Sequence, residues 1–487
     1  MNTDKLLENV EIIKIHGKIP QYVDDITDYS ENVKSDGLFF CVNGNNTNGK
    51  NYIKDVENRG AKLIVGEEYC ETEVCFLVVK DIKKAMAQIC KNYFGEPQKS
   101  MKITGVVGTN GKTSICHILS RIFEYSGKKT AVIGTLGVTV NGITEETGLT
   151  SLGIIRLYKT LAKLRDEHVE WLFMEVSAHA IEQRRIEGLF FEGLIFSNCT
   201  EDHLDYFKNF TTYENTKVSV FNSDICKFAV VNSDDETGRK IINRASVKTI
   251  SYAVYNPSDV FAIDIAQNEN GISYIINLFD IIYDIKCPLI GMCNVYNTLA
   301  AVSFAATEGL KIHKISGALK SMSAISGRAE YVCTIRDARI YLDYAHTPDG
   351  LKRTLSSFRK ICSGRLICLF GCGGNREKEK RSIMGEISGV LCDFTVITTD
   401  NPRYEDPYSI ISEIESGIRR VSLQYITITD RRSAIEYAVS KLKRGDILVV
   451  AGKGAETYQE IMGVKHDFSD KQILNEIAIS CSGESIG

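Results

Sequence analysis

Short apolar runs alternate with stretches of helical spacing along the first hundred residues. Runs bounded by turn residues predict strands at 37–42, 61–65 and 76–79. Apolar residues three and four positions apart predict helices at 52–58 and 81–94. Gly95-Glu96-Pro97 then interrupts the pattern, because neither glycine nor proline continues a helix well. We therefore expect residues 1–97 to form a small α/β domain.

A second series of alternating strand and helix patterns begins at the buried-type run 103–107. Further strands are predicted at 172–176 and 194–197, and the alternation favours a parallel sheet wrapped by helices. Residues 250–288 are richer in β-branched and aromatic residues, which predicts additional antiparallel strands. The expected domain covers residues 98–327.

The remaining residues, 328–487, repeat the same alternation and predict a third α/β domain. Its expected strands are residues 339–342, 365–370, 394–397 and 447–451, with helices between them. The chain has no internal sequence repeat and no low-complexity tract. Three domains also suit a chain of 487 residues.

Composition narrows the class of protein. Lys and Arg number 58 and Asp and Glu 62, so the net charge is 58 − 62 = −4, which argues against a general nucleic-acid or membrane-surface binder. No apolar stretch reaches membrane-spanning length, and the first residues lack the apolar core of a signal peptide. The fifteen cysteines include no Cys-x-x-Cys pair. We expect reduced core thiols in a cytoplasmic protein.

A glycine-rich loop follows the predicted strand 103–107 and precedes helical spacing. It reads Gly108-Thr109-Asn110-Gly111-Lys112-Thr113-Ser114. Glycines let backbone N–H groups converge on phosphate oxygens, and the helix N-terminus favours negative charge. Lys112 is expected to reach the β- and γ-phosphates and the Thr113 hydroxyl to bind Mg²⁺. The glycine spacing departs from the strict Walker A motif, so an ordinary glycine-rich turn is the alternative.

This loop resembles that of the Mur ligases, ATP-dependent enzymes of peptidoglycan precursor synthesis, and the resemblance extends in order over nearly the whole chain. The nearest pattern is the MurE type. The resemblance implies an α/β fold of three domains, with a central P-loop-type domain carrying a parallel sheet and a Rossmann-like C-terminal domain. It implies ATP as co-substrate, two Mg²⁺ ions, small-molecule substrates and a monomer.

The middle-domain motifs resemble the family's metal and nucleotide-sugar residues. Glu175 in Met-Glu-Val-Ser-Ala-His is implied as a Mg²⁺ ligand. The Asp-His-Leu-Asp-Tyr block implies that His203 lies near a second Mg²⁺ and that Lys217 is carbamylated, which would turn its amine into an anionic metal ligand. The residues implied to bind the UDP-linked substrate are Ser30, Asn45, Thr150, Ser151, Ser177, Gln183 and Arg185.

Three further positions are implied to contact ATP. Asn294 matches the family's Asn-x-x-Asn helix start, although a plain N-cap is the alternative. Arg328 in Gly-Arg-x-Glu is expected to face the γ-phosphate and, with Lys112, His203 and Lys217, to act in catalysis. Asp343 is a candidate for a ribose contact or for a bridge to Arg328.

The third domain carries the motif Asp400-Asn401-Pro402-Arg403, which resembles the signature of the meso-diaminopimelate-adding subgroup. Arg403 could clamp the distal carboxylate of that amino acid bidentately, a group that lysine lacks. Arg376, Gly452 and Glu456 complete the implied amino-acid pocket, with Glu456 expected to pair with the distal ammonium. The implied reaction joins meso-2,6-diaminopimelate to the D-glutamate of UDP-N-acetylmuramoyl-L-alanyl-D-glutamate through an acyl phosphate.

Several positions depart from the family pattern around the acceptor and the amino-acid pocket. They are Tyr29, Glu31, Leu152, Ala178, Asn375 and Ala455. These departures leave open a lysine-adding ligase or a specialised relative with another acceptor. A folate polyglutamate synthetase leaves the Asn-Pro-Arg block unexplained. A non-catalytic nucleotide-binding scaffold is the rival from another class, and the intact Lys112, Glu175, His203 and Lys217 argue against it.

Overall fold

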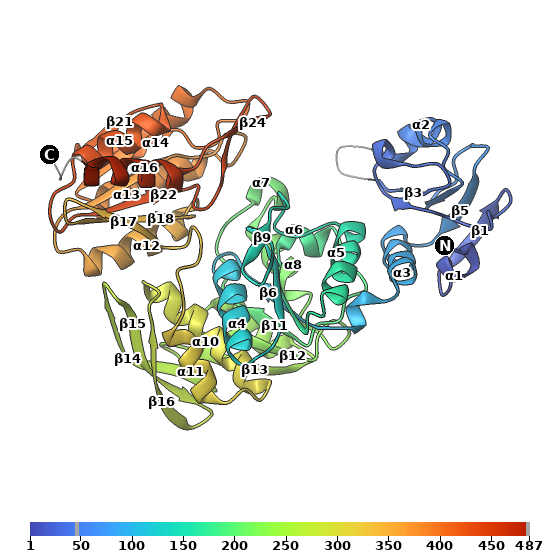
Figure 1. Ribbon diagram of the computed structural model, residues 1–487, viewed down its shortest axis with the longest axis horizontal. Coiled ribbons are helices and arrows are strands. Elements are labelled where there is room, and N and C mark those ends of the chain that lie inside the picture. The colour runs from blue at the N-terminus through green and yellow to red at the C-terminus, as the bar shows by residue number, and fades with distance from the viewer. Residues whose placement is uncertain (44–47, 484–487) are drawn as a thin grey trace. The chain divides into compact units, whose positions relative to one another are not determined.

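The computed structural model describes residues 1–43 and 48–483 (Figure 1). The chain divides into two compact units, each assembled from segments that are distant in sequence. The first comprises Met1–Gly105, Lys128–Leu194 and Val220–Phe228, and the second comprises Val106–Gly127, Ile195–Ser219 and the chain from Ala229 onward. The described strands form sheets of five, eleven and six strands and one two-stranded hairpin.

The five-stranded sheet is built by the N-terminal segment and has the order β1-β5-β4-β3-β2. Its strands are β1 (Ile12–His16), β2 (Ile26–Thr27), β3 (Leu38–Cys41), β4 (Leu63–Gly66) and β5 (Cys75–Val79). The helices are α1 (Thr3–Leu6), α2 (Ile53–Asn58) and α3 (Ile82–Phe94). All pairings are parallel except that of β1 with β5. The three predicted strands and two predicted helices are confirmed.

Helix α3 has a capping residue at each end. The Asp81 carboxylate accepts hydrogen bonds from the backbone N–H groups of Lys83 and Lys84, both at 3.0 Å, so it is the N-cap and the helix starts one residue later than predicted. Gly95 ends the helix with φ of +69°. The second oxygen of Asp81 accepts a bond from Arg184 at 2.8 Å.

The eleven-stranded sheet has the order β16-β15-β14-β13-β12-β11-β6-β10-β7-β8-β9. Its strands are β6 (Lys102–Val107), β7 (Thr130–Gly134), β8 (Gly137–Val140), β9 (Ile143–Glu145), β10 (Trp171–Val176), β11 (Gly193–Phe196), β12 (Phe228–Asn232), β13 (Lys248–Ala253), β14 (Val260–Asn268), β15 (Gly271–Leu278) and β16 (Ile281–Cys287). Strands β10 and β11 are buried along their whole length, which is typical of parallel strands covered on both faces.

The helices of this segment are α4 (Lys112–Tyr125), α5 (Ile154–Asp166), α6 (Ala178–Glu182), α7 (Leu204–Phe207), α8 (Phe210–Val218), α9 (Glu236–Arg244), α10 (Met292–Thr307) and α11 (Ile312–Lys320). The antiparallel strands predicted over 250–288 are confirmed for β14, β15 and β16. Strand β13 differs, because it pairs in parallel with β14 through only two residue pairs. The connection between them is too short to carry a crossover helix, so the parallel contact stays short.

The six-stranded sheet has the order β17-β18-β22-β19-β20-β21 and is parallel apart from the β17–β18 hairpin. Its strands are β17 (Glu330–Ile335), β18 (Ala338–Asp343), β19 (Leu366–Phe370), β20 (Phe394–Ile397), β21 (Tyr425–Thr427) and β22 (Ile447–Ala451), and β23 (Tyr458–Ile461) with β24 (Val464–Asp467) forms the separate hairpin. The helices are α12 (Pro348–Ile361), α13 (Glu379–Leu391), α14 (Pro407–Ile418), α15 (Arg431–Ser440) and α16 (Asp470–Gly483).

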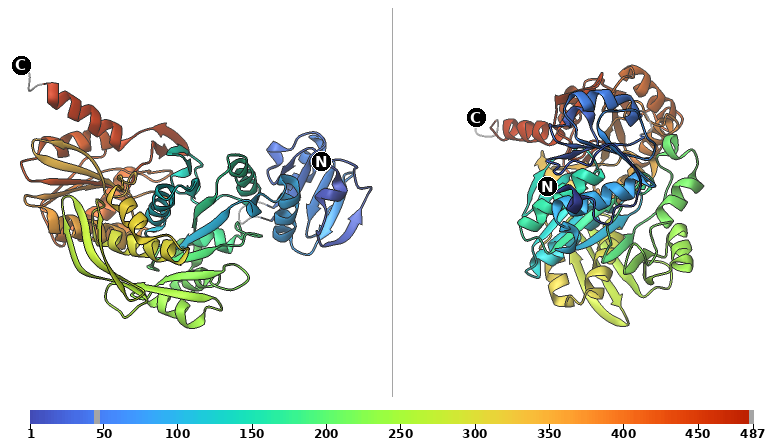
Figure 2. Two further views of the ribbon diagram at one scale, coloured as in Figure 1. Left: turned by 60° about the horizontal axis from the view of Figure 1, so that its bottom comes forward. Right: turned by 90° about the vertical axis from the view of Figure 1, so that its right-hand side faces the viewer.

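Two apolar clusters form on opposite faces of this last sheet. One contains Leu355 of α12, Met384 of α13 and Ile414 of α14, and the other contains Ile435 of α15 and Leu474 of α16. The helices therefore cover both faces, as the ribbon views allow the reader to follow (Figure 2). This arrangement confirms the predicted α/β class, and each of the four strands predicted after residue 328 is present.

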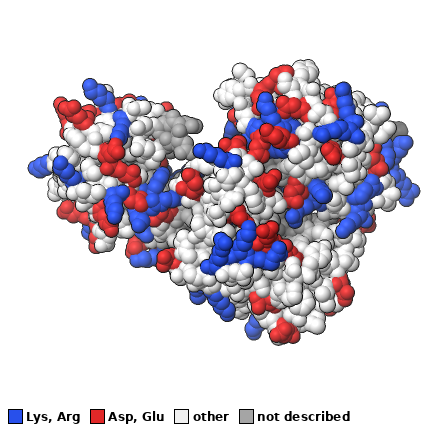
Figure 3. Space-filling model, turned by 180° about the vertical axis from the view of Figure 1, so that it is seen from behind, with Lys and Arg blue, Asp and Glu red and all other residues white. Residues whose placement is uncertain are grey.

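The surface and the cysteines agree with the composition. Acidic and basic side chains are interspersed on the face drawn in Figure 3. Among the described residues, no helix is both long and apolar enough to span a membrane. All fifteen cysteines are free thiols, and nine of them are buried, as expected for small core residues.

Candidate active site

The loop between β6 and α4 has a backbone that only glycine fits at two positions. Gly111 has φ of +90° and forms the N-cap of α4, and a Cβ there would lie 2.6 Å from Asn297 Oδ1. A Cβ at Gly108 would lie 1.9 Å from Ser197 Oγ. The first turn of α4 therefore presents its backbone N–H groups at the end of the loop, which is a geometry suited to phosphate.

Residues that follow β11 hold this loop in place. The backbone N–H of Thr109 donates to Asn198 O at 2.8 Å, and that of Asn110 donates to Asn198 Oδ1 at 3.0 Å. Ser197 Oγ and Asn198 Nδ2 both donate to Asn110 O, at 2.6 and 3.0 Å. The loop conformation is thus fixed by a second segment of the chain rather than by its own sequence alone.

The charged side chains expected to meet phosphate lie at the same loop. Lys112 Nζ donates to Gly108 O at 2.8 Å and to Thr109 O at 2.9 Å, which places the ammonium over the loop backbone. Arg328 Nη2 donates to the Thr113 hydroxyl at 2.9 Å, and its guanidinium lies 4.5 Å from the Tyr344 ring centre. The structure therefore brings together Lys112, Thr113 and Arg328, although Thr113 and Arg328 are 215 residues apart in sequence.

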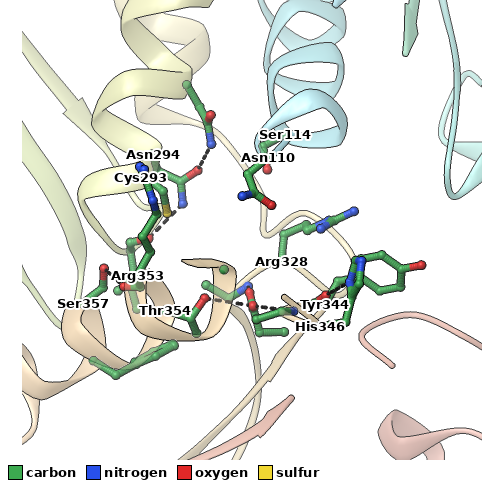
Figure 4. A pocket seen from close by; sticks show the side chains of 17 residues that line it. Asn110, Ser114, Cys293, Asn294, Arg328, Tyr344, His346, Arg353, Thr354 and Ser357 are labelled. Atoms are coloured by element: carbon green, nitrogen blue, oxygen red, sulfur yellow. Dashed lines mark hydrogen bonds between the residues drawn. The ribbon is translucent and has the colours of Figure 1, made fainter. Parts of the chain in front are cut away.

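A pocket opens beside this loop, and Figure 4 shows its lining side chains. Asn110 and Ser114 contribute from the loop and α4, Asn294 from α10, and Arg328 and Asp343 from the segment around β18. The predicted nucleotide contacts Asn110, Ser114, Asn294, Arg328 and Asp343 therefore share one cavity. Its mixture of amides, two guanidinium groups and apolar groups suits a nucleotide base and ribose.

Asn294 is not an N-cap, which removes the alternative interpretation of that residue. Gly291 caps α10, and Asn294 lies inside the first turn, where its Nδ2 donates to Ile290 O at 2.8 Å. Asn297 Nδ2 donates to Asn294 Oδ1 at 2.9 Å, and both amides are buried. These two asparagines form a fixed polar wall of the pocket.

Asp343 organises the backbone around Arg328 rather than bonding that side chain. Its carboxylate accepts hydrogen bonds from Ala329 N at 2.7 Å, Ala345 N at 3.0 Å and Thr354 Oγ1 at 2.9 Å. Burial raises the pKa of Asp343, while the Ala329 bond and the nearby Arg328 charge act against that rise. The expected bridge to Arg328 is thus an electrostatic attraction without a direct hydrogen bond.

Lys217 lies fully buried on α8 and faces the phosphate loop. Its Nζ donates to Thr109 Oγ1 at 2.7 Å and to Cys199 Sγ at 3.7 Å. The ring of Tyr213, one helical turn earlier, lies 3.9 Å from the amine. Burial lowers the pKa of Lys217 to about 7, because a buried ammonium loses its hydration. A substantial fraction of the amine is therefore neutral near pH 7.

His203 has a backbone φ of +56° and is the residue before α7. Its Nε2 lies 3.5 Å from Asp202 Oδ2, and its ring makes an edge contact with Tyr213. Burial tends to raise the pKa of Asp202, but the positive charges around it, His203 foremost, hold that pKa below its usual value. Asp202 is thus an anion directed toward the imidazole.

Glu175 is buried at the end of β10 and is held by Thr135, which follows β7. Its two carboxylate oxygens accept bonds from Thr135 N at 2.8 Å and from Thr135 Oγ1 at 3.1 Å. A Cβ at Gly134 would lie 2.2 Å from Glu175 Oε1, so this position must be glycine for the carboxylate to keep its place. The Thr135 hydroxyl continues the network to Thr150 Oγ1 at 3.2 Å.

The residues expected to bind the UDP-linked substrate form one hydrogen-bonded group beside Glu175. Ser151 Oγ donates to Glu175 O at 3.0 Å and lies 3.2 Å from Ser177 Oγ. Arg185 donates to Ser151 O at 2.8 Å, and its Nη2 donates to Gln183 Oε1 at 2.7 Å. Thus Thr150, Ser151, Ser177, Gln183 and Arg185 are brought together.

One of the expected substrate residues, Ser30, is not part of this group. Ser30 begins a short 3₁₀ helix, Ser30–Asn32, beside the exposed Tyr29 in the N-terminal segment. Asn45 lies outside the described residues.

The expected amino-acid pocket contains a buried ammonium. Lys453 Nζ donates to Glu456 Oε2 at 3.0 Å and to Asn401 Oδ1 at 3.2 Å, and Asn401 Nδ2 donates to the same Glu456 oxygen at 2.9 Å. The Lys453 side chain is fully buried. Glu456 therefore already balances one positive charge of the protein.

Arg403 has the left-handed backbone conformation, with φ of +51°, after Pro402. Its Nε donates to Glu460 Oε2 at 3.1 Å and its Nη1 to Gly374 O at 2.8 Å. The backbone N–H of Arg403 donates to Glu460 O at 3.0 Å, which ties the residue to β23. The guanidinium is therefore held by a side chain and by a backbone carbonyl.

Tightly packed glycines surround this motif. A Cβ at Gly374 would lie 1.9 Å from Pro402 O, one at Gly371 2.3 Å from Thr398 O, and one at Gly452 2.7 Å from Asp400 Oδ2. Asp400 and Gly452 are thus in contact, whereas Arg376 is exposed. The loop after β19 and the Asp400–Arg403 motif pack backbone to backbone.

Comparison with known protein families and proteins identifies the family to which this chain belongs. The family model of the Mur ligase middle domain matches residues 106–305, and that of the Mur ligase glutamate ligase domain matches residues 327–454. The UDP-N-acetylmuramoyl-L-alanyl-D-glutamate–2,6-diaminopimelate ligase of Syntrophomonas wolfei is 36% identical over 98% of this chain and 99% of its own length. The chain belongs to the Mur ligase family.

Other Mur ligases support the same placement. Ligase 1 of that name from Clostridium acetobutylicum is 35% identical over 98% of this chain and 99% of its own. A solved structure of a UDP-N-acetylmuramoyl-L-alanyl-D-glutamate–2,6-diaminopimelate ligase matches with a TM-score of 0.71 at 26% identity, over 100% and 99% of the two chains. The MurF ligase of Thermotoga maritima, solved with ADP, shares the fold with a TM-score of 0.63 at 19% identity, over 88% and 93%. The predicted family, MurE type and three-domain Mur ligase architecture are confirmed.

Three residues of the Mur ligase site were missed by sequence reasoning. Asn198 holds the phosphate loop, Thr135 holds Glu175, and Glu460 pairs with Arg403. Asn198 lies four residues before the Asp-His-Leu-Asp-Tyr block, so its role could have been anticipated. Thr135 and Glu460 carry no local signal, because their partners lie 40 and 57 residues away in sequence.

Proposed function

We propose that this Mur ligase uses ATP to join meso-2,6-diaminopimelate to the D-glutamate of UDP-N-acetylmuramoyl-L-alanyl-D-glutamate. The observation that carries the proposal is the phosphate loop with Lys112, Thr113 and Arg328 converging on it beside one pocket. Relatives that align over nearly the whole chain are named for this ligation. The Asp-Asn-Pro-Arg motif, with a guanidinium held at Arg403, supports the choice of amino acid.

In the proposed reaction, the γ-carboxylate of the D-glutamate attacks the γ-phosphorus of ATP, the bond to the bridging oxygen breaks, and ADP leaves. The amine of diaminopimelate, after losing a proton, attacks the acyl carbon, and inorganic phosphate leaves from the tetrahedral intermediate. Lys112 and Arg328 stabilise the negative charge on the transferring phosphoryl group. Asn294 and Asn297 orient the nucleotide.

The donors expected to hold Mg²⁺ suit a hard cation. The Thr113 hydroxyl and the Glu175 carboxylate offer oxygen ligands, and His203 stands beside the anionic Asp202. The metal, when bound, screens the charge repulsion between the phosphates and the attacking carboxylate. Thr135 keeps the Glu175 carboxylate oriented, and Gly134 keeps the space beside it clear.

Carbamylation of Lys217 fits the surroundings of that residue. A neutral amine adds to CO₂ and loses a proton to give a carbamate, and burial makes the neutral form accessible near pH 7. Thr109 and Tyr213 offer hydroxyl groups near the amine, and Lys112 offers positive charge. The product would be an anionic oxygen ligand next to the phosphate loop, available to the second Mg²⁺.

The same reaction implies roles for the acceptor-binding residues and for the three predicted domains. Thr150, Ser151, Ser177, Gln183 and Arg185, with Ser30 from the N-terminal segment, would bind the UDP-linked acceptor. Residues 1–97, 98–327 and 328–487 would serve as acceptor, ATP and amino-acid domains. The enzyme would act as a monomer, and ATP and a nucleotide-linked acceptor suit the cytoplasm.

The test is ATP-dependent phosphate release with UDP-N-acetylmuramoyl-L-alanyl-D-glutamate, comparing meso-2,6-diaminopimelate with L-lysine. We expect release with diaminopimelate and at most about one hundredth of it with lysine, because a missing partner for a charged hydrogen bond costs about this much. Equal release with lysine would identify a lysine-adding ligase. No release with either amino acid, from protein that binds ATP, would require another acceptor or a non-catalytic role.

A further inference from the structure

Two cysteines of the N-terminal segment lie against one apolar cluster. Cys41 is the last residue of β3, and its side chain is buried in that cluster. Cys70 lies in the connection between β4 and β5, outside any helix or strand, and packs against the same cluster while it stays partly exposed. Two thiols that are distant in sequence are therefore neighbours at one end of the five-stranded sheet.

The surrounding residues keep room beside Cys41 and hold Cys70 near it. Gly66, the last residue of β4, pairs with Cys41 across the two strands, and a Cβ at Gly66 would lie 3.4 Å from the Cβ of Cys41. Glycine thus leaves space next to the Cys41 side chain. The ring of Tyr69 stacks on that of His16 with 3.8 Å between ring centres, which fixes the residue directly before Cys70.

The two sulfurs differ in their surroundings. Burial raises the pKa of Cys41 to about 11, and the neighbouring Cys70 thiol adds to that rise. Cys70 is the more exposed of the two, and its Sγ donates to Glu68 O at 3.8 Å. Lys50 pairs with the Glu68 carboxylate and lies close enough to both sulfurs to act on their charge. A nearby ammonium favours a thiolate, so Cys70 is the thiol that an oxidant meets first.

We propose that Cys70 and Cys41 form a site of reversible oxidation by peroxides, at which Cys70 is oxidised and Cys41 converts the product into a disulfide. The Cys70 thiolate attacks one peroxide oxygen, the O–O bond breaks, and a sulfenic acid forms while the other oxygen leaves with the thiol proton. The Cys41 sulfur then attacks the Cys70 sulfur, the S–O bond breaks, and water leaves with the Cys41 proton. Hydrogen peroxide and two thiols thus give one disulfide and two waters.

The disulfide would form at the edge of the sheet where a ligand is expected. Strands β2, β3, β4 and β5 run parallel, and open α/β sheets bind ligands at the carboxyl ends of such strands. Cys41 ends β3, so the bridge would tie the connection after β4 to that edge. We expect the oxidised enzyme to bind the nucleotide-linked acceptor less tightly, an effect that rests on the proposed function, whereas the oxidation itself does not.

The first test is mass spectrometry of the whole enzyme after treatment with hydrogen peroxide, alkylation of free thiols and digestion. We expect the peptides of Cys41 and Cys70 to be joined, two hydrogen atoms lighter than the separate peptides, and to separate again with dithiothreitol. In Cys41→Ala, Cys70 should instead gain oxygen atoms that dithiothreitol does not remove, because no second thiol intercepts the sulfenic acid. Cys362→Ser is the matched control, since Cys362 is also partly exposed and donates to a nearby carbonyl, Gly364 O, at 3.4 Å. This variant should still form the linkage.

The second test is phosphate release before and after the same treatment. The KM for the acceptor should rise at least about fivefold in the oxidised wild-type enzyme, the lower end of ordinary coupling between two sites. Dithiothreitol should reverse the rise, the KM for ATP should not change, and Cys70→Ser should not respond.

Three results would overturn the proposal: no linkage between the two peptides, a linkage without a change in the KM for the acceptor, or the same change in Cys70→Ser. If the reduced wild-type enzyme did not use the acceptor at all, the proposed function would fail, and the mass measurement would still decide whether the two thiols form the oxidation site.

Discussion

Lys112 has two roles that can be distinguished: its ammonium contacts the backbone of its loop, and its charge is expected to act on phosphate. Its ammonium bonds two carbonyl groups of its own loop, Gly108 O and Thr109 O. Those carbonyls belong to a loop that Asn198 and Ser197 also hold. The conformation of the loop therefore does not depend on Lys112 alone, whereas neutralising the charge of a bound phosphate does depend on it.

Lys112→Ala should abolish turnover while the protein stays folded. We expect phosphate release to fall by at least about 10³-fold, because no other described ammonium bonds the loop backbone. Phosphate release and thermal unfolding of the variant measure the two effects. Retained turnover would show that the loop does not bind the reacting phosphates.

Lys217 gives a prediction about dissolved CO₂. In buffer depleted of CO₂, phosphate release should fall at least about tenfold and recover on addition of bicarbonate. The recovery should become faster between pH 6 and pH 8, because the neutral fraction of the amine rises as the pH passes its pKa of about 7. The measurement is the time course of phosphate release at each pH.

A matched lysine separates carbamylation from general effects of bicarbonate. The Lys240 side chain is 38% exposed and pairs with Glu214, so Lys240→Ala should keep the bicarbonate response. Lys217→Ala should lose both activity and response. An enzyme indifferent to CO₂ would mean that Lys217 acts as a plain amine.

Residue-level reasoning from sequence placed side chains correctly in the fold where they are contiguous. Lys112, Thr113 and Ser114 follow one strand and open one helix, so local spacing was enough to place them. Glu460 was missed, because its meaning comes only from its contact with Arg403. Asp343 was expected near Arg328, but its bond goes to the backbone of Ala329, a distinction that spacing does not encode.

At the scale of elements, the start of α3 shows that one residue can cap a helix and also form an ion pair with another segment. Asp81 caps α3 with one carboxylate oxygen and holds Arg184 with the other, so it joins the helix to the segment that contains Arg185. A capping carboxylate is also favoured by the helix dipole. Its loss should therefore loosen the first turn of α3.

Asp81→Ala should lower the protection of the first-turn amides of α3 against hydrogen exchange. A lost cap costs about 1–2 kcal/mol, which corresponds to about a 5- to 30-fold faster exchange. Asp81→Asn keeps a capping oxygen and loses the ion pair, so its exchange should change by less than about threefold. Mass spectrometry of the peptide that contains α3 measures both. Equal effects of the two variants would assign the stabilisation to the ion pair instead.

The hydrophobic pattern predicted elements best where both faces are covered. Strands β11 and β22 are continuous apolar runs, and β10 is apolar except for Glu175; all three were identified, because burial on both faces leaves few polar interruptions. Strand β1 was missed, since its middle residues are exposed and its existence depends on pairing with β5, some sixty residues later. The three-residue β21 is too short to give a periodic signal.

At the scale of the whole molecule, the bond between Arg328 and Thr113 joins the segment just before β17 to the first turn of α4, at the end of the phosphate loop. The pocket proposed to hold the nucleotide is likewise lined from α4, α10, α12 and the end of β18. Binding a nucleotide there must stabilise contacts between parts that are far apart in sequence. Such stabilisation is measurable as a shift in unfolding.

Addition of Mg²⁺ and ATP should therefore raise the unfolding temperature of the whole enzyme. At a concentration one hundred times the dissociation constant, the stabilisation is about 2.7 kcal/mol. Calorimetry with and without the nucleotide measures it, and Arg328→Ala and Asn297→Ala should reduce the shift. Removing Mg²⁺ with a chelator should reduce it as well. An equal shift in both variants would place the nucleotide elsewhere.

The packed glycines around the Asp400–Arg403 motif limit how this family member can change its amino-acid substrate during evolution. At Gly371 and Gly374 any side chain would overlap backbone atoms, so point mutations there damage the loop before they alter its choice of amino acid. Paths to a new substrate are thus confined to side chains at the rim, Arg403 and Glu460 among them. Directed evolution of altered cell-wall building blocks should begin with paired libraries at those two codons and leave the glycines untouched.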